Sequence, residues 1–108
     1  MAEAYVNGYQ DVGTSSTAIY TTPAGTEAIV RSLYIANVDG SNSADITVEI
    51  VDDGGSPDAK IASAITVPAK STFQAIDVPI FLNAGDAVKL LASATGDLEA
   101  VISVVQIT

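Results

Sequence analysis

Hydrophobic and polar residues alternate along short segments of this chain, and a period of two is the spacing of a β-strand with one buried face. The alternation is cleanest in the segment Asp45–Val51. There Ile46, Val48 and Ile50 share one face, and the polar residues between them share the other. Clusters of Gly, Pro, Asp and Asn separate such segments roughly every 8–12 residues, which predicts an all-β sandwich or barrel.

The segments between these clusters predict about eight strands, and none of them is long enough for a helix of several turns. Pro79 is expected to end the sixth strand, because proline has no N–H to donate to a sheet. The strands are expected at Tyr5–Val12, Ala18–Thr22, Ala28–Asn37, Asp45–Val51, Lys60–Val67, Phe73–Val78, Ala87–Ala94 and Leu98–Ile107.

Two of these segments are apolar on both faces. In Ala28–Asn37, strict alternation places Val30 and Tyr34 opposite Leu33, and in Leu98–Ile107 it places Val101 and Val105 opposite Ile102. A strand with two apolar faces is covered either by its own chain or by a neighbouring subunit, and the sequence leaves both open. On the second interpretation, Tyr34, Val101 and Val105 are candidate interface residues.

The segment Tyr5–Val12 holds two of the four tyrosines, Tyr5 and Tyr9, and precedes a Gly-Thr-Ser-Ser stretch. Tyrosine is favoured at protein interfaces because its ring is apolar and its hydroxyl is polar. Residues 1–13 are therefore either a first strand whose rings pack on the core edge, or an arm that reaches onto a neighbour by strand addition. Residues 14–108 form the sandwich domain. We add Tyr5 and Tyr9 to the interface candidates and expect a homo-oligomer.

The amino-acid composition excludes several classes of catalytic and metal site and argues against some partners. The 108 residues contain no Cys, His or Trp, which excludes thiol nucleophiles, Cys–His metal clusters and Ser-His-Asp triads, and no cofactor is expected. The net charge of -9 argues against binding nucleic acid or an anionic membrane surface. No apolar run approaches the ~20 residues needed to span a bilayer. The first residues do not resemble a secretory signal, so synthesis in a cytoplasm is expected.

Acidic turns are the remaining candidates for ligand chemistry. Asp52, Asp53 and Asp58 surround a Gly pair, and Asp39-Gly-Ser-Asn supplies further oxygen atoms of the kind that Ca²⁺ prefers. The spacing lacks the regular acidic pattern of an EF-hand loop, and solvated turns have the same composition. A calcium- or carbohydrate-binding module is therefore kept as an alternative function. Arg31 is expected to form a cross-strand pair with Glu27 or Glu49.

Two stretches resemble small structural proteins of tailed-bacteriophage virions. Ile19–Asn37 contains a Tyr-Thr-x-Pro-Ala-Gly turn at Tyr20–Gly25 and then an apolar strand that ends in Asn. Phe81–Val88 contains the companion Leu-x-Ala-Gly-Asp turn at Leu82–Asp86. The two stretches cover about a quarter of the chain.

This resemblance implies a jelly-roll-like β-sandwich that assembles into a virion. It agrees with the single antiparallel sandwich of about eight strands expected from the pattern, and because the residues offer no catalytic group, the chain is not expected to be an enzyme. The resemblance implies a capsid decoration subunit that binds the outside of a phage head, with a tail- or fibre-associated subunit as the alternative. The partners are then further copies of the chain, expected as a trimer, and a capsid or other virion protein. Such a subunit is made in the host cytoplasm and resides in the virion.

Overall fold

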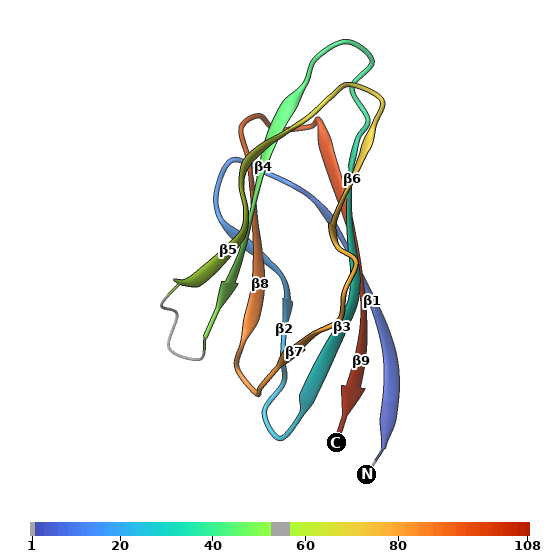
Figure 1. Cartoon of the computed structure of the whole chain (residues 1–108), viewed down its shortest axis with the longest axis vertical. Coiled ribbons are helices and arrows are strands. Elements are labelled where there is room, and N and C mark those ends of the chain that lie inside the picture. Colours follow the sequence, from blue (N-terminus) through green and yellow to red (C-terminus); the bar gives the residue numbers. More distant parts are fainter. Residues whose placement is uncertain (1, 53–56) are drawn as a thin grey trace.

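Strands form two antiparallel sheets that pack face to face in the computed structural model (Figure 1). The structure describes residues 2–52 and 57–108, and over these residues there is no helix. The first sheet, here the β1 sheet, contains β1 (Glu3–Asp11), β9 (Leu98–Ile107), β3 (Glu27–Asn37), β6 (Thr72–Ile76) and β7 (Ile80–Leu82). The second, the β2 sheet, contains β2 (Thr17–Thr21), β8 (Ala87–Ala92), β4 (Ala44–Val51) and β5 (Pro57–Val67).

Strands from opposite ends of the chain lie side by side in both sheets. The order is β1-β9-β3-β6 in one sheet, with β7 also against β3, and β2-β8-β4-β5 in the other. The first strand therefore pairs with the last, and the second with the last but one, which is the wrapping of a jelly roll. The predicted all-β, jelly-roll-like sandwich is confirmed.

The predicted end of the sixth strand at Pro79 is only half right. β6 pairs with one part of β3 and β7 pairs with another, so that Phe73 lies opposite Ile35 and Phe81 lies opposite Ile29. Residues 77–79 leave the ladder between them, where the missing N–H of proline is not needed. β6 and β7 are thus one jelly-roll strand with a break, and the sequence pattern did not predict its second half.

A β-bulge in β3 corrects the predicted faces of that strand. The register with β9 shifts between Val30 and Ser32, which leaves Arg31 as the extra residue. The bulge brings both Val30 and Leu33 to the inner face, where each is fully buried, whereas strict alternation had placed them on opposite faces. Part of the apparent two-faced character of β3 therefore comes from one inserted residue.

Aliphatic side chains from both sheets fill the space between the layers. The largest fully buried ones include Leu33, Ile35 and Ile102 from the β1 sheet, and Ile46 and Leu90 from the β2 sheet. In β4 alternation correctly places Ile46 and Val48 in the core, and Ile50 is only partly buried against it. Burial of this apolar surface is the main stabilising contribution to a domain of this size.

The edge strands β1 and β2 approach closely where the two sheets meet. Gly8 of β1 has no side chain, and a Cβ there would lie 2.9 Å from Ile102 Cγ2 and 3.3 Å from the carbonyl oxygen of Ile19. Gln10 Nε2 donates a hydrogen bond of 3.1 Å to the carbonyl oxygen of Ala18 on β2. These contacts close one side of the sandwich.

Candidate interaction face

All five candidate interface residues lie on one surface, the outer face of the β1 sheet. The register of four strands places Tyr5, Val105, Ile29 and Phe81 side by side in one row. A second row holds Tyr9, Val101, Tyr34 and Gln74, in which Gln74 Nε2 donates a hydrogen bond of 3.2 Å to the Tyr34 hydroxyl. We call these residues the tyrosine face.

A polar row separates the two apolar rows of the tyrosine face. Asn7, Ser103 and Ser32 lie opposite one another on β1, β9 and β3. Ser103 Oγ donates a hydrogen bond of 3.0 Å to Asn7 Oδ1. This hydrogen bond joins the side chains of β1 and β9 between the two rows.

Exposure differs sharply among the face residues. Tyr5, Tyr9 and Phe81 are 80%, 73% and 76% exposed, whereas Val105 is only 6% exposed. Val105 lies between Tyr5 and Ile29 in the register and does not belong to the buried cluster between the sheets. It therefore forms the floor of the face, while the aromatic rings are its accessible part.

Phe81 and Ile29 are the apolar residues of this face that the sequence pattern missed. Phe81 falls outside the predicted strands, because the sixth strand is expected to end at Pro79. Ile80 and Leu82 turn inward on either side of it, so the short apolar run after the proline was the signal that a further strand begins there.

The outer face of the β2 sheet has a different chemistry. Glu49 lies between Lys60 and Lys89 on the neighbouring strands. Thr66 Oγ1 donates a hydrogen bond of 2.9 Å to Asp45 Oδ1 on the same sheet. This surface carries complementary charges and polar groups, so the two outer faces of the sandwich are not equivalent.

The expected pair between Arg31 and Glu49 is wrong. Arg31 is exposed at the bulge in β3, and Glu49 lies on β4 of the other sheet. The carboxylate of Glu49 has lysines opposite it on both sides instead.

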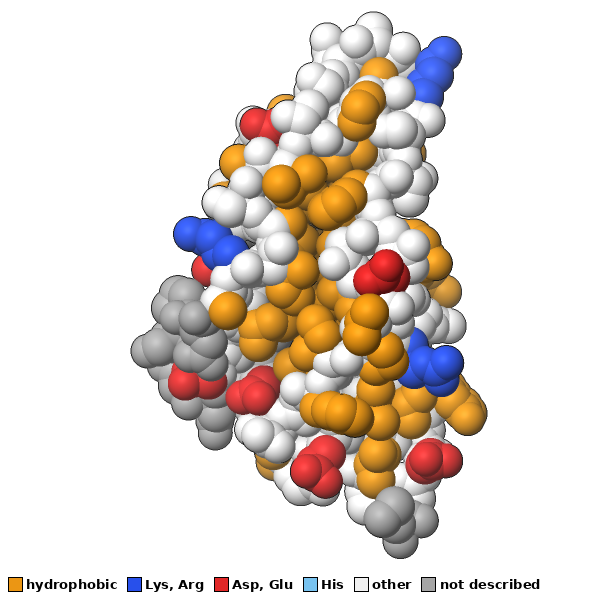
Figure 2. Space-filling view, in the orientation of Figure 1, with side chains coloured by type: hydrophobic (Ala, Val, Ile, Leu, Met, Phe, Trp, Pro, Cys, Tyr) orange, Lys and Arg blue, Asp and Glu red, His pale blue; other side chains and the backbone are white. Residues whose placement is uncertain are grey.

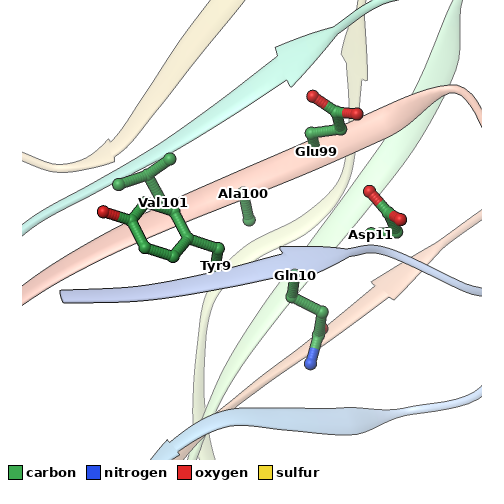
Figure 3. Close-up of a pocket in the computed structure, with 6 residues that line it drawn as sticks. All are labelled: Tyr9, Gln10, Asp11, Glu99, Ala100 and Val101. Atoms are coloured by element: carbon green, nitrogen blue, oxygen red, sulfur yellow. The ribbon is translucent and has the colours of Figure 1, made fainter.

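One corner of the tyrosine face carries two carboxylates next to a ring. Asp11 and Glu99 are direct partners in the β1–β9 register, beside a hollow of about 300 Å³ that Tyr9 and Val101 also line. Figure 3 shows the Tyr9 ring next to Val101, with both carboxylates on that side of the strands and Gln10 on the opposite side. Like charges directly opposite each other on paired strands destabilise the isolated sheet.

The acidic turn at Asp39 is satisfied by its own groups. The Asp39 carboxylate accepts hydrogen bonds from the backbone N–H of Ser41 (2.9 Å) and from Asn42, which lowers the pKa of Asp39 to about 2. Desolvation, together with a hydrogen bond to Asp39 and its charge, raises the pKa of Asp97 above its ordinary value. The polar groups of the turn therefore occupy the oxygen atoms that were considered as calcium ligands.

Only part of the second candidate calcium-binding turn, the one with Asp52, Asp53 and Asp58, lies within the described residues. Asp53 and the Gly pair lie outside the described residues, as does the side chain of Asp58. Within residues 2–52 and 57–108, no three acidic side chains come together in a way that could hold a metal ion.

The two turns of the virion resemblance are neighbours in space. The Thr26 N–H donates to the Pro23 carbonyl (3.2 Å) across a turn that needs the positive φ of Gly25, and Gly85 has a positive φ in the second turn. Thr22 joins the turns, because its N–H donates to the Asp86 carbonyl and its carbonyl accepts from Gly85, each at 2.9 Å. Both turns therefore close the same end of the sandwich.

Asn37, the Asn that ends the first resembling stretch, fastens the opposite end. Its buried Nδ2 donates hydrogen bonds to the carbonyl oxygens of Val67 (2.9 Å) and Asn42 (3.0 Å), and its Oδ1 accepts one from the Asp39 N–H. The turns and the Asn that carry the resemblance thus form hydrogen bonds that connect the loops at the two ends of the sandwich.

Comparisons with known proteins identify the fold. No protein-family model matches the chain, and no curated protein matches it in sequence. A chain from Bacillus endospore appendages, described as a family of disulfide-linked pili, shares the fold with a TM-score of 0.59 and 15% identity over 99% of this chain and 87% of that one. A chain of the Helicobacter pylori bacteriophage KHP30 capsid also shares the fold, with a TM-score of 0.55 and 10% identity over 100% of this chain and 89% of that one.

In the described part of this chain there is no helix that could cross a membrane.

Proposed function

We propose that this chain is a non-enzymatic structural subunit of a virion, which decorates the outside of a phage head and attaches through the tyrosine face. The observation that carries the proposal is the difference between the two outer faces. One presents exposed rings of Tyr5, Tyr9 and Phe81 in ordered rows, whereas the other carries a row of Lys and Glu side chains and no exposed aromatic ring among the described residues. Aromatic side chains are enriched at protein interfaces because they bury a large apolar area with few rotatable bonds.

The fold relatives support an assembly role. One belongs to pili and the other to a phage capsid, and both of these are large protein assemblies. The pili are described as disulfide-linked, whereas the 108 residues of this chain contain no Cys and supply no thiol for such a link. The resemblance of Ile19–Asn37 and Phe81–Val88 to tailed-phage proteins favours the capsid further.

Self-association is part of the proposal, with a trimer as the expected form. Figure 2 shows a band of hydrophobic side chains along the long axis of the molecule, in the region of the view where Figure 1 places β5, β6 and β7. Val78, between β6 and β7, is 69% exposed, and Ile65 on β5 is 40% exposed. These edges are available to neighbouring copies while the tyrosine face contacts the particle. Light scattering at tens of micromolar should give a mass above the 11.0 kDa of one chain.

Sedimentation with particles tests the attachment. Purified protein is mixed with phage particles that lack it, and the particles are pelleted. We expect co-sedimentation with heads at micromolar concentration, and a large loss of it in a variant with both Tyr5→Ser and Phe81→Ser. The control is Val38→Ser, which removes an exposed apolar residue that lies outside both the tyrosine face and the β5–β7 edges.

The outcome of this experiment shows which part of the virion, if any, the protein binds. Binding only to tails or fibres would move the subunit to that part of the virion. Failure to pellet with heads, tails or fibres would overturn the virion proposal. A rise in melting temperature with a glycan or with Ca²⁺ would then favour the binding-module alternative.

A further inference from the structure

Most of the charged side chains on the tyrosine face are negative. Outward positions on β1, β9 and β3 carry four carboxylates and one guanidinium, all of them exposed. These residues are Glu3, Asp11, Glu27, Glu99 and Arg31. The apolar rows lie between them, so any protein that covers the rings also covers or borders the carboxylates.

Charge complementarity therefore decides between occupants of this face. A second copy placed face to face would set acidic edges against acidic edges, in a chain whose net charge is already -9. Like-charge contacts across an interface cost several kcal/mol and suppress the wrong partner. Neighbouring copies thus have to use other edges of the sandwich.

We propose that the tyrosine face binds a different protein with a basic surface, whose lysine or arginine side chains meet Asp11 and Glu99 beside Tyr9. This rests on the proposed function and deepens it by stating the chemistry of the partner. In the isolated protein the two carboxylates oppose each other across the β1–β9 register. A cation between them relieves that repulsion, and the neighbouring Tyr9 ring attracts a cation through its π face.

The geometry of the corner agrees with this occupant. The hollow of about 300 Å³ is open at the surface and is lined by the ring of Tyr9, the side chain of Val101 and both carboxylates. A long side chain with an apolar stem and a cationic end can lay its stem on Val101 and place its charge at Asp11 and Glu99. The exposed rings of Tyr5 and Phe81 lie beyond the hollow and extend the contact along the same face.

The test compares two double variants with the same change in charge on the same face. Asp11→Asn with Glu99→Gln removes the corner pair, and Glu3→Gln with Glu27→Gln removes two carboxylates from the other end. Binding is measured by sedimentation with the particles described above and, separately, by titration calorimetry with a hexa-arginine peptide. The corner variant should lose at least about tenfold in affinity for both probes, and the control variant less than about threefold.

Thermal unfolding distinguishes a binding role of Asp11 and Glu99 from a role in stabilising the fold. Because the corner variant removes like-charge repulsion, its melting temperature should equal or exceed that of the wild type while its binding falls. If both variants weaken binding equally, or neither does, the basic-partner inference is overturned.

The two proposals fail separately. Unimpaired sedimentation of the corner variant with particles would leave the virion role standing and reject the basic partner. Conversely, selective loss of hexa-arginine binding, without any sedimentation of the wild type, would support the cation site and reject the virion role.

Discussion

Gly8 is the position at which one added methyl group should test how the sandwich closes. It lies on the inner face of β1, and a Cβ there would be 2.9 Å from Ile102 Cγ2 and 3.3 Å from the carbonyl oxygen of Ile19. Ile102 is fully buried, and its Cγ2 is bonded directly to Cβ, so it moves only if the whole side chain rotates. The other neighbour is backbone. Neither contact can relax cheaply.

The expected cost of Gly8→Ala follows from these distances. Carbon atoms normally pack at about 3.5–4.0 Å, so the contact with Ile102 has to open by roughly 0.6–1.1 Å. Overpacking of this kind costs about 1–3 kcal/mol, and the lower backbone entropy of unfolded Ala returns about 0.5–1 kcal/mol. Because both neighbours are rigid, the overpacking cost falls in the upper half of that range, and the net loss of about 1–2.5 kcal/mol lowers the melting temperature of a domain this small by roughly 4–20 °C.

Gly13→Ala is the matched control. Gly13 follows the same strand, has nothing within 4 Å of its would-be Cβ and does not adopt a positive φ. Its substitution should leave the melting temperature unchanged or raise it slightly. Thermal denaturation followed by circular dichroism compares the two variants. Equal melting temperatures would refute the close approach of β1 to the core and to β2.

Three further predictions concern a buried amide, a residue with a positive φ and a carboxyl group with a raised pKa. Asn37→Ala should cost about 2–4 kcal/mol in urea unfolding, because it removes three hydrogen bonds from a buried amide; a loss below about 1 kcal/mol would show that water replaces them. Lys70→Gly should stabilise by about 0.5–1 kcal/mol, because Lys70 has a φ of 63°; an unchanged midpoint of unfolding would show that the turn is not strained. Asp97→Asn should raise the melting temperature at pH 7 but not at pH 3. The raised pKa of Asp97 makes its contribution favourable at acid pH and lost as pH rises through that pKa. Asp39 acts in the opposite direction, since its stabilisation is lost only as pH falls toward its pKa of about 2. A gain for Asp97→Asn that does not change with pH would contradict the repulsion between the two groups.

Local patterns in the sequence determined the strands and several turns. The alternation in β4 correctly placed Ile46 and Val48 inside and Glu49 outside. The turns at Pro23–Thr26 and Asn83–Asp86 were also recognisable, because proline presets one backbone angle and Gly25 and Gly85 supply positive φ. These features depend on residues a few positions apart, which is the range that a sequence pattern reports.

Part of the composition of the tyrosine face was predictable, but its arrangement was not. Two separate sequence features predict its members: tyrosines in the first segment indicate Tyr5 and Tyr9, and strands with two apolar faces indicate Tyr34, Val101 and Val105. Only the pairing of β1 with β9, and of β9 with β3, places them in adjacent rows. That pairing joins the two ends of the chain, and alternation within a strand does not specify which strand lies beside it.

Tertiary structure also decided where the period of two fails. The bulge at Arg31 and the break at residues 77–79 each change which side chains face the core or the solvent, and they bring Leu33 inward and Phe81 into the face. Alternation assumes an unbroken ladder, whereas a bulge forms where long-range pairing has to accommodate one extra residue. The sequence pattern therefore correctly predicted a two-layered β-fold, and it named five residues as candidates for an interface. The long-range hydrogen-bonded pairing decided which of them meet, because register is set between strands and not within them.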